Sequence, residues 1–172
     1  MASDATPYRF GDLLALARRS WTLAMARELE ARGYGNYRVS DAASMRLLLA
    51  GPLNVGRLAS ALGVTRQGAR KVARGLEERQ FAITQADPED ARRTDVVLTA
   101  AGALYAHAIV EVIASLNTQL AGQVDAAALV AADTVLRASI TDSSLQPAAE
   151  RVPPPARRQS TASAPRQPRP RG

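Results

Sequence analysis

The chain has 172 residues, enough for one domain or for one domain with an appendage, and 47% of them are apolar. It contains no cysteine, which excludes disulfides, thiolate metal sites and thiol nucleophiles. Its first residues lack the pattern of a secretory signal peptide, and its apolar runs are shorter than the ~18 residues of a membrane span, so we expect a cytoplasmic protein with no membrane partner.

The formal net charge of +6 is concentrated at the C-terminal end of the chain. Residues 151–172 contain six arginines and no acidic residue, whereas residues 1–150 contain 16 basic and 16 acidic residues. Within this neutral part, residues 57–74 carry five basic residues and no acidic one. A neutral domain with a single cationic stretch indicates an anionic partner that binds at one place.

The first part of the chain predicts three helices. Apolar residues recur at helical spacing over residues 10–25, which indicates a long amphipathic helix. Ser40 is a typical N-cap and predicts a second helix over residues 41–49. Asn54 is the expected cap of a third helix that ends at Leu62.

A short turn then leads into a strongly cationic helix. Gly63 forms the turn, and Thr65 is the expected cap of a fourth helix over residues 66–79. Its apolar residues form one stripe, and the hydrogen-bond donors occupy an arc of about 140° on the other side. These donors are Arg66, Gln67, Arg70, Lys71 and Arg74. Gly68 and Gly75 share one flank of the helix, where they are expected to permit close packing against the preceding helix or against DNA.

The periodicity changes after this helix. Residues 81–85 and 95–98 alternate as strands do, and the polar segment between them predicts a β-hairpin with a long tip. The tip carries Asp90, Arg92 and Arg93. Asp90 is suited to an ion pair with Arg92 that would hold the tip, and the alternative is a merely soluble turn.

Two further helices follow the hairpin. Thr99 is the expected cap of a long helix with a continuous apolar face that extends to Leu120. Asp125 begins a last helix that extends to Ile140. The predicted fold is therefore mainly α, a winged helix-turn-helix with a two-stranded wing and long N- and C-terminal dimerisation helices.

In this order of elements, the cationic helix is expected to be the recognition helix that enters the major groove of DNA. Arg66 and Arg70 can bind guanine O6 and N7, and Gln67 can pair with adenine, whereas Lys71 and Arg74 are better placed for phosphates. The arginines of the wing suit the minor groove, whose negative potential attracts them. The alternative for the helix is a solvated cationic face without a partner.

The segment from Leu58 to Gly102 resembles the core of the bacterial MarR family of transcriptional regulators. The motifs that carry the resemblance are Leu62-Gly63-Val64-Thr65 before the recognition helix, Asp90-Ala91-Arg92 in the wing, and Leu98-Thr99-Ala100-Ala101-Gly102 at the start of the long helix. With its flanking elements the resemblance covers residues 8–141. The sequence departs from the family at Gln80, where glycine is usual, and at Ala91 in the wing tip.

The resemblance implies a homodimer that binds a pseudo-palindromic DNA operator. By position, Thr65, Arg66, Gln67 and Arg70 would contact the major groove and Arg92 the minor groove. The implied domain covers residues 8–144, with a DNA-binding core at about 40–100 and dimerisation helices at about 8–33 and 100–141. Residues 145–172, rich in proline and arginine, are expected to be a disordered tail.

Members of the family are often released from DNA by a small aromatic or phenolic ligand. The candidates for such a site are Trp21, Arg46, Tyr105 and His107. Three of them have a simpler interpretation: core packing for Trp21, an ion pair for Arg46, and a surface or hydrogen-bonded interface position for His107.

Catalysis has little support in the sequence. One histidine, no cysteine and no glycine-rich phosphate loop leave no catalytic residues, no metal site and no cofactor to propose. We therefore expect a sequence-specific double-stranded DNA-binding regulator, associated with the nucleoid and acting as a ligand-released repressor. Two alternatives remain: a protein-interaction module, or a non-specific architectural DNA binder driven by the arginine-rich tail.

Overall fold

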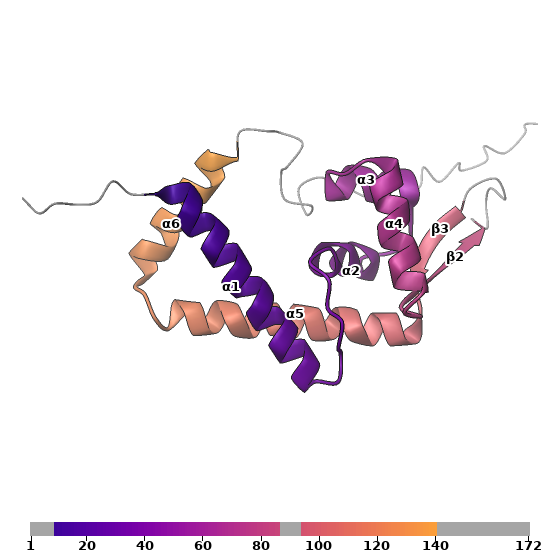
Figure 1. The fold of residues 1–172 in the computed structure, drawn as a ribbon, viewed down its shortest axis with the longest axis horizontal. Helices are drawn as coiled ribbons and strands as arrows, with labels where there is room; N and C mark the ends of the chain where they lie inside the picture. The colour runs from indigo at the N-terminus through magenta and orange to yellow at the C-terminus, as the bar shows by residue number, and fades with distance from the viewer. Residues whose placement is uncertain (1–8, 87–93, 141–172) are drawn as a thin grey trace, which may run out of the picture.

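The computed structural model describes residues 9–86 and 94–140, and the elements in these two ranges follow the predicted order (Figure 1). The helices are α1 (Phe10–Ala31), α2 (Asp41–Leu49), α3 (Val55–Leu62), α4 (Arg66–Glu77), α5 (Ala100–Ala121) and α6 (Ala126–Ser139). The strands are β1 (Leu53–Asn54), β2 (Ala82–Ala86) and β3 (Thr94–Leu98). The mainly helical, winged helix-turn-helix prediction is confirmed. The predicted tail, residues 145–172, lies outside the described residues.

Four helices begin at the caps that the sequence predicts. The side chains of Asn54, Thr65, Thr99 and Asp125 each accept a hydrogen bond from a backbone N–H three residues later. These bonds satisfy one of the donors left unpaired at each helix start and so fix where each helix begins. Ser40 is the exception, because its backbone is already helical and its side chain makes no cap bond.

The sheet has one strand more than the sequence predicts. β2 and β3 form the expected antiparallel hairpin, with Ala82 opposite Leu98, and β1 pairs with the other edge of β3, with Leu53 opposite Val96. A strand of two residues is too short to show a period, which is why the sequence did not reveal it. The residues of the hairpin tip, 87–93, lie outside the described residues.

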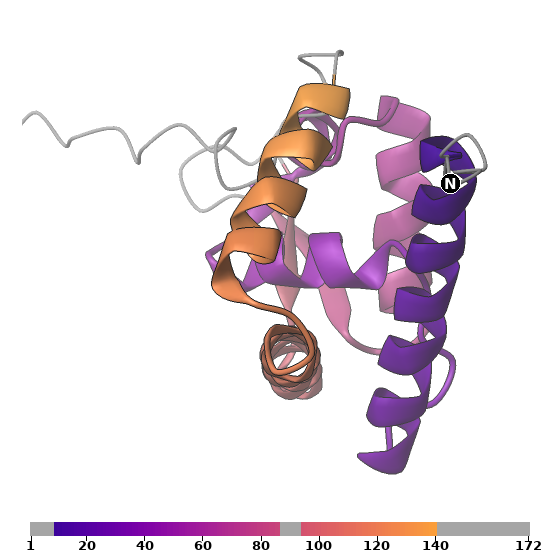
Figure 2. The same ribbon diagram turned by 90° about the vertical axis from the view of Figure 1, so that its left-hand side faces the viewer.

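The core lies where α2, α3 and α4 pack above the first half of α5, with α1 crossing α5 beside them (Figures 1 and 2). Its fully buried large side chains come from all five of these helices and from β3. They are Met25, Leu29, Met45, Leu58, Leu76, Val96, Tyr105, Ile109 and Val112. This packing fixes α4 relative to the long helix α5.

The apolar character of α5 extends along its whole length. By length and composition α5 is apolar enough to cross a membrane, with a mean hydropathy of 1.3, although the chain has no uninterrupted apolar run of that length. Counting uninterrupted apolar runs missed this helix, because polar residues such as His107 and Glu111 interrupt it. Its buried residues, which include Tyr105 and Ile109, form part of the core, as is usual for a central helix.

Much apolar surface on α1, α5 and α6 remains uncovered within one chain. No residue of α6 is buried. The most exposed apolar side chains include Leu16 and Leu23 of α1, Leu104 of α5 and Val130 of α6. Phe10, Leu13, Leu14 and Ala17 of α1 face Ala131, Ala132, Val135 and Leu136 of α6 across an apolar groove of about 330 Å³.

Candidate nucleic-acid interface

α4 is held by a tight turn at one end and by an apolar stripe along its length. Gly63 adopts the left-handed conformation (φ 66°, ψ 35°), which ends α3 and lets the chain turn sharply into α4. Thr65 Oγ1 then accepts the Gly68 N–H at 3.1 Å. Ala69, Ala73 and Leu76 are buried against the core, so the opposite side of α4 faces solvent.

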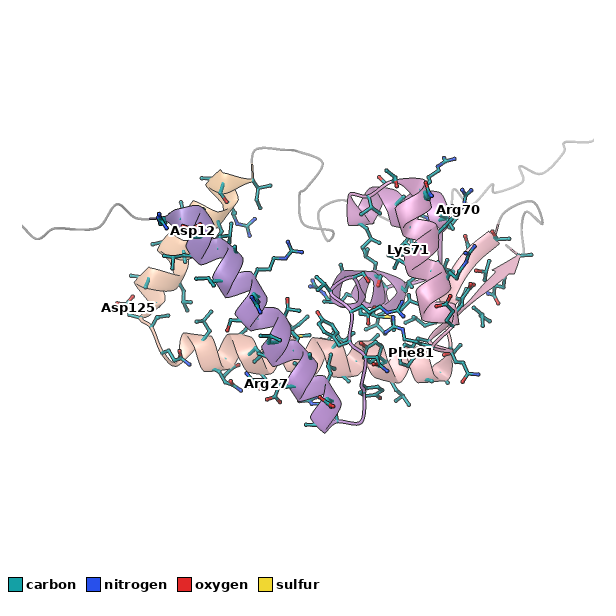
Figure 3. All side chains as sticks on the ribbon, viewed as in Figure 1. Asp12, Arg27, Arg70, Lys71, Phe81 and Asp125 are labelled. Atoms are coloured by element: carbon teal, nitrogen blue, oxygen red, sulfur yellow. The ribbon has the colours of Figure 1, made fainter. Side chains whose placement is uncertain are left out.

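The exposed side of α4 forms a cationic groove of about 710 Å³. Six residues of α4 and its cap were predicted to contact DNA, and five of them line this groove. The sixth, Arg66, lies toward Gly56 of α3. Arg70 and Lys71 project from α4 in Figure 3. The lining residues are Arg38, Thr65, Gln67, Gly68, Arg70, Lys71, Arg74, Gly75 and Glu78.

The positive charges of α4 are not neutralised by the described part of the chain. Arg66, Arg70, Lys71 and Arg74 are all exposed, and none of them forms an ion pair with a described residue. Three of the four lie in the N-terminal half of the helix, where the free N–H groups already favour an anion. This surface is therefore chemically suited to phosphates and to the acceptor edges of bases.

The C-terminal end of α4 has a different environment. Glu77 accepts a hydrogen bond from Thr84 of β2, which ties the helix to the wing. Just after the helix, Arg79 binds Asp41 of α2 through two hydrogen bonds of 2.8 and 2.9 Å. Among the residues that line the groove, Glu78 is the one acidic residue, and it lies at this end of α4.

Asp41 is the centre of a buried polar cluster that sequence reasoning missed. Besides Arg79, it accepts hydrogen bonds from the Tyr105 hydroxyl at 2.9 Å and from the Arg38 N–H at 3.0 Å. Burial, reinforced by the Asp41 carboxylate, raises the pKa of Tyr105, and the hydrogen bond to Asp41 raises the pKa of Arg79. The cluster therefore fixes the end of α4 to both α2 and α5.

The sequence offered little signal for this cluster. Asp41 stands in the first turn of a helix, where an acidic residue ordinarily interacts with the helix dipole. Its side-chain partners, Arg79 and Tyr105, are 38 and 64 residues away, so only the tertiary structure reveals these contacts.

The four residues predicted to bind a ligand have different environments. Trp21 is half-buried and packs against the core, and Tyr105 is fully buried with its hydroxyl bound to Asp41. Arg46 of α2 and His107 of α5 are exposed. None of the four lines the groove along α4 or the apolar groove between α1 and α6. A ligand site at these residues stays a prediction.

The wing residues predicted to contact DNA, Asp90, Arg92 and Arg93, lie outside the described residues. In the chain they lie between β2 and β3, and Figure 1 shows both strands next to the C-terminal half of α4. Among the described residues, no group of three or more histidine or acidic side chains is arranged to hold a metal ion.

The sequence comparisons point to relatives without an assigned function. No protein-family model matches the chain. The protein Rv2011c of Mycobacterium tuberculosis, described as uncharacterized, is 37% identical over 131 residues, which cover 75% of this chain and 85% of the relative. The uncharacterized protein Mb2034c of Mycobacterium bovis matches with the same identity and coverage.

Among the solved structures that resemble this fold are DNA-bound and ligand-bound transcriptional regulators. The MepR–DNA complex of Staphylococcus aureus matches with a TM-score of 0.65 and 19% identity, covering 77% of this chain and 96% of MepR. PcaV of Streptomyces coelicolor, solved with its natural ligand, gives a TM-score of 0.64 and 19% identity, covering 81% and 96% of the two chains. The chain therefore belongs to one family with the two mycobacterial proteins, and its fold is that of the MarR-type winged-helix regulators.

Proposed function

We propose that this protein is a sequence-specific regulator of transcription that binds double-stranded DNA. The observation that carries the proposal is the exposed face of α4, where Arg66, Arg70, Lys71 and Arg74 have no acidic partner among the described residues. A capped helix with unpaired donors in its first turns can enter a major groove. The fold shared with MepR, solved as a DNA complex, supports this function.

The donors of α4 divide into two groups by their position along the helix. Thr65, Arg66, Gln67 and Arg70 lie at the end that enters the major groove, where Arg66 and Arg70 would bind guanine and Gln67 adenine. Lys71 and Arg74 would bind phosphates. In the wing, Arg92 and Arg93 would bind the minor groove, with Asp90 holding the tip.

A homodimer would place two such helices on one duplex. Large apolar side chains of α1, α5 and α6 stay exposed in one chain, and no residue of α6 is buried; large exposed apolar patches ordinarily mark protein–protein interfaces. A second copy that covers this surface would bind a pseudo-palindrome, with the two α4 helices about 34 Å apart. Association in solution is tested by sedimentation equilibrium.

Regulation by a small ligand follows from the same comparison. PcaV has this fold and was solved with its natural ligand, which supports a small-molecule effector for this chain. From the resemblance to the MarR family, the proposed effector is aromatic or phenolic and releases a repressor from DNA. The protein would then act in the cytoplasm, at the nucleoid. If Trp21 lines the site, a phenolic effector quenches its fluorescence saturably, and the absence of quenching across a panel of such compounds contradicts this part of the proposal.

The direct test of DNA binding is selection of random duplexes by the protein at about 0.15 M salt, where non-specific phosphate binding is weak. Enrichment of an inverted repeat supports a dimeric, sequence-specific regulator. Arg70→Ala should then weaken binding to that repeat by about 1–3 kcal/mol and relax its specificity. An equal loss on every duplex would contradict base reading by Arg70.

Two other functions predict different results in the selection or after deletion of the tail. A folded dimer that enriches no sequence would indicate a protein-interaction module, in which α4 binds an acidic partner. An architectural DNA binder driven by the arginine-rich tail would lose nearly all affinity when residues 146–172 are deleted. A sequence-specific regulator would keep its preferred site after the same deletion.

A further inference from the structure

Arg38 joins the cationic groove from outside α4, and no sequence pattern predicts it there. It lies in the connection between α1 and α2, 28 residues or more before the basic residues of α4, yet it lines the same groove as Arg70, Lys71 and Arg74. It is exposed, and its guanidinium group forms no hydrogen bond or ion pair with a described residue, Glu78 of the same groove included.

The Arg38 guanidinium lies against a glycine of α4. A Cβ atom built on Gly75 would lie 2.4 Å from Arg38 Nη1, closer than real Cβ contacts allow. Gly75 thus leaves a notch on the flank of α4 that the guanidinium occupies. For Gly75, the expectation of close packing against the preceding helix is wrong, because only atoms of Arg38 lie within 4 Å of a Cβ built there. The other expectation, close approach to DNA, stays a prediction.

The backbone of Arg38 is fixed at both of its polar groups. Its N–H donates to Asp41 Oδ2 at 3.0 Å, and its carbonyl accepts the Asp41 N–H at 2.8 Å. Asp41 is itself held by Arg79 and Tyr105 inside the buried cluster. An arginine with an anchored backbone and a free head loses less conformational freedom when it binds an anion than one on a mobile loop.

We propose that Arg38, seated in the notch at Gly75, binds a phosphate of the duplex beside the major groove that α4 enters. The proposal rests on the proposed DNA-binding function. A B-DNA major groove is about 12 Å wide, so side chains that flank the C-terminal half of an inserted helix meet the sugar–phosphate backbone and not the base edges. Arg38 therefore adds affinity and orients α4, and it carries no sequence information.

The salt dependence of DNA binding tests this contact, because each neutralised phosphate adds a fixed increment to the slope of log K against log salt. We expect Arg38→Ala to reduce the slope of log K against log salt by about 0.9 per protomer bound. The loss should be the same on the duplex enriched in the selection and on a mixed-sequence duplex of equal length. Arg38→Lys should keep the slope, since it keeps the charge. Arg27→Ala is the matched control, because Arg27 is an exposed arginine of α1 far from α4 (Figure 3).

The role of the notch is tested with Gly75→Ala. This change favours the helix and displaces the exposed, flexible end of Arg38. The variant should therefore unfold at an equal or higher temperature than the wild type, and its DNA binding should weaken by no more than Arg38→Ala weakens it. In the Arg38→Ala background, Gly75→Ala should have no further effect on binding. A loss that persists undiminished in that background would show that Gly75 acts without Arg38, and the notch would be refuted.

The outcomes separate this inference from the proposed function. If the wild type binds DNA and Arg70→Ala weakens it, but Arg38→Ala has the same slope as the wild type and Arg27→Ala, the phosphate contact is refuted and the proposed function stands. If the wild type binds neither duplex in the folded state, both fall together.

Discussion

Replacing Arg79 by methionine removes the cation from the buried cluster at the base of α4 while keeping most of the apolar stem. Asp41 is fully buried, and the Arg79 side chain is 14% exposed. The substitution would leave a carboxylate inside the protein with two donors, the Tyr105 hydroxyl and the Arg38 N–H. The Arg79 guanidinium also lies 5.3 Å from the centre of the Phe81 ring, and this contact would be lost as well.

The expected cost is large for a single substitution. Removing one partner of a buried ion pair costs about 3–5 kcal/mol. Because two donors still bind Asp41, we expect Arg79→Met to lower the free energy of unfolding by about 3 kcal/mol. Domains of this size have a total unfolding free energy of about 5–15 kcal/mol, so the loss is a considerable fraction of it. Adding Asp41→Asn to Arg79→Met should raise the free energy of unfolding by at least about 1 kcal/mol, because the double variant has no unpaired carboxylate at this place.

Urea denaturation at a fixed protomer concentration measures these differences. Arg32→Met is the matched control: Arg32 also has an acidic partner at 2.8 Å, Glu111, but the two side chains are 35% and 69% exposed. An exposed pair of this kind contributes about 1 kcal/mol or less. If Arg79→Met and Arg32→Met have equal effects, burial does not determine the contribution of the pair, and the reasoning is wrong.

Three further predictions concern stability. Because the pKa of Tyr105 is raised above 10.0, the folded state keeps the phenol proton to a higher pH than the unfolded state. The contribution of this proton to the free energy of unfolding should be fully present below about pH 10 and fall above it by up to about 1.4 kcal/mol per pH unit. Tyr105→Phe should flatten this fall in urea titrations between pH 9 and 11. Gly102→Ala would place a Cβ atom 1.8 Å from the Phe81 carbonyl oxygen and should cost about 3 kcal/mol or more in denaturation, whereas Gly11→Ala, with nothing within 4 Å, should change stability by about 0.5 kcal/mol at most. Gln80 has a positive φ of 60°, a conformation that costs an L-residue about 1–2 kcal/mol, so Gln80→Gly should raise the melting temperature, and a lower value would contradict the strain.

The local structure of this protein was largely predictable because its signals are local. Asn54, Thr65 and Thr99 cap the helices that they were expected to cap, and the change from helical to alternating apolar spacing marked the wing. The basic face of α4 was also predictable, because residues on one helix share a face by spacing alone. The glycine that the family usually has at position 80 is replaced here, and the backbone nevertheless keeps the left-handed turn.

Tertiary structure alone decided which distant residues meet. Nothing in the sequence relates Asp41 to Arg79 and Tyr105, because a buried ion pair has no period and its members lie in three separate elements. The same holds for Arg38 and Gly75, where a side chain from one connection occupies space that a helix leaves free. The sequence by itself determined the elements and the charge of α4. Packing determined how α4 is anchored and which additional cation stands beside it, because both depend on contacts between segments that only folding brings together.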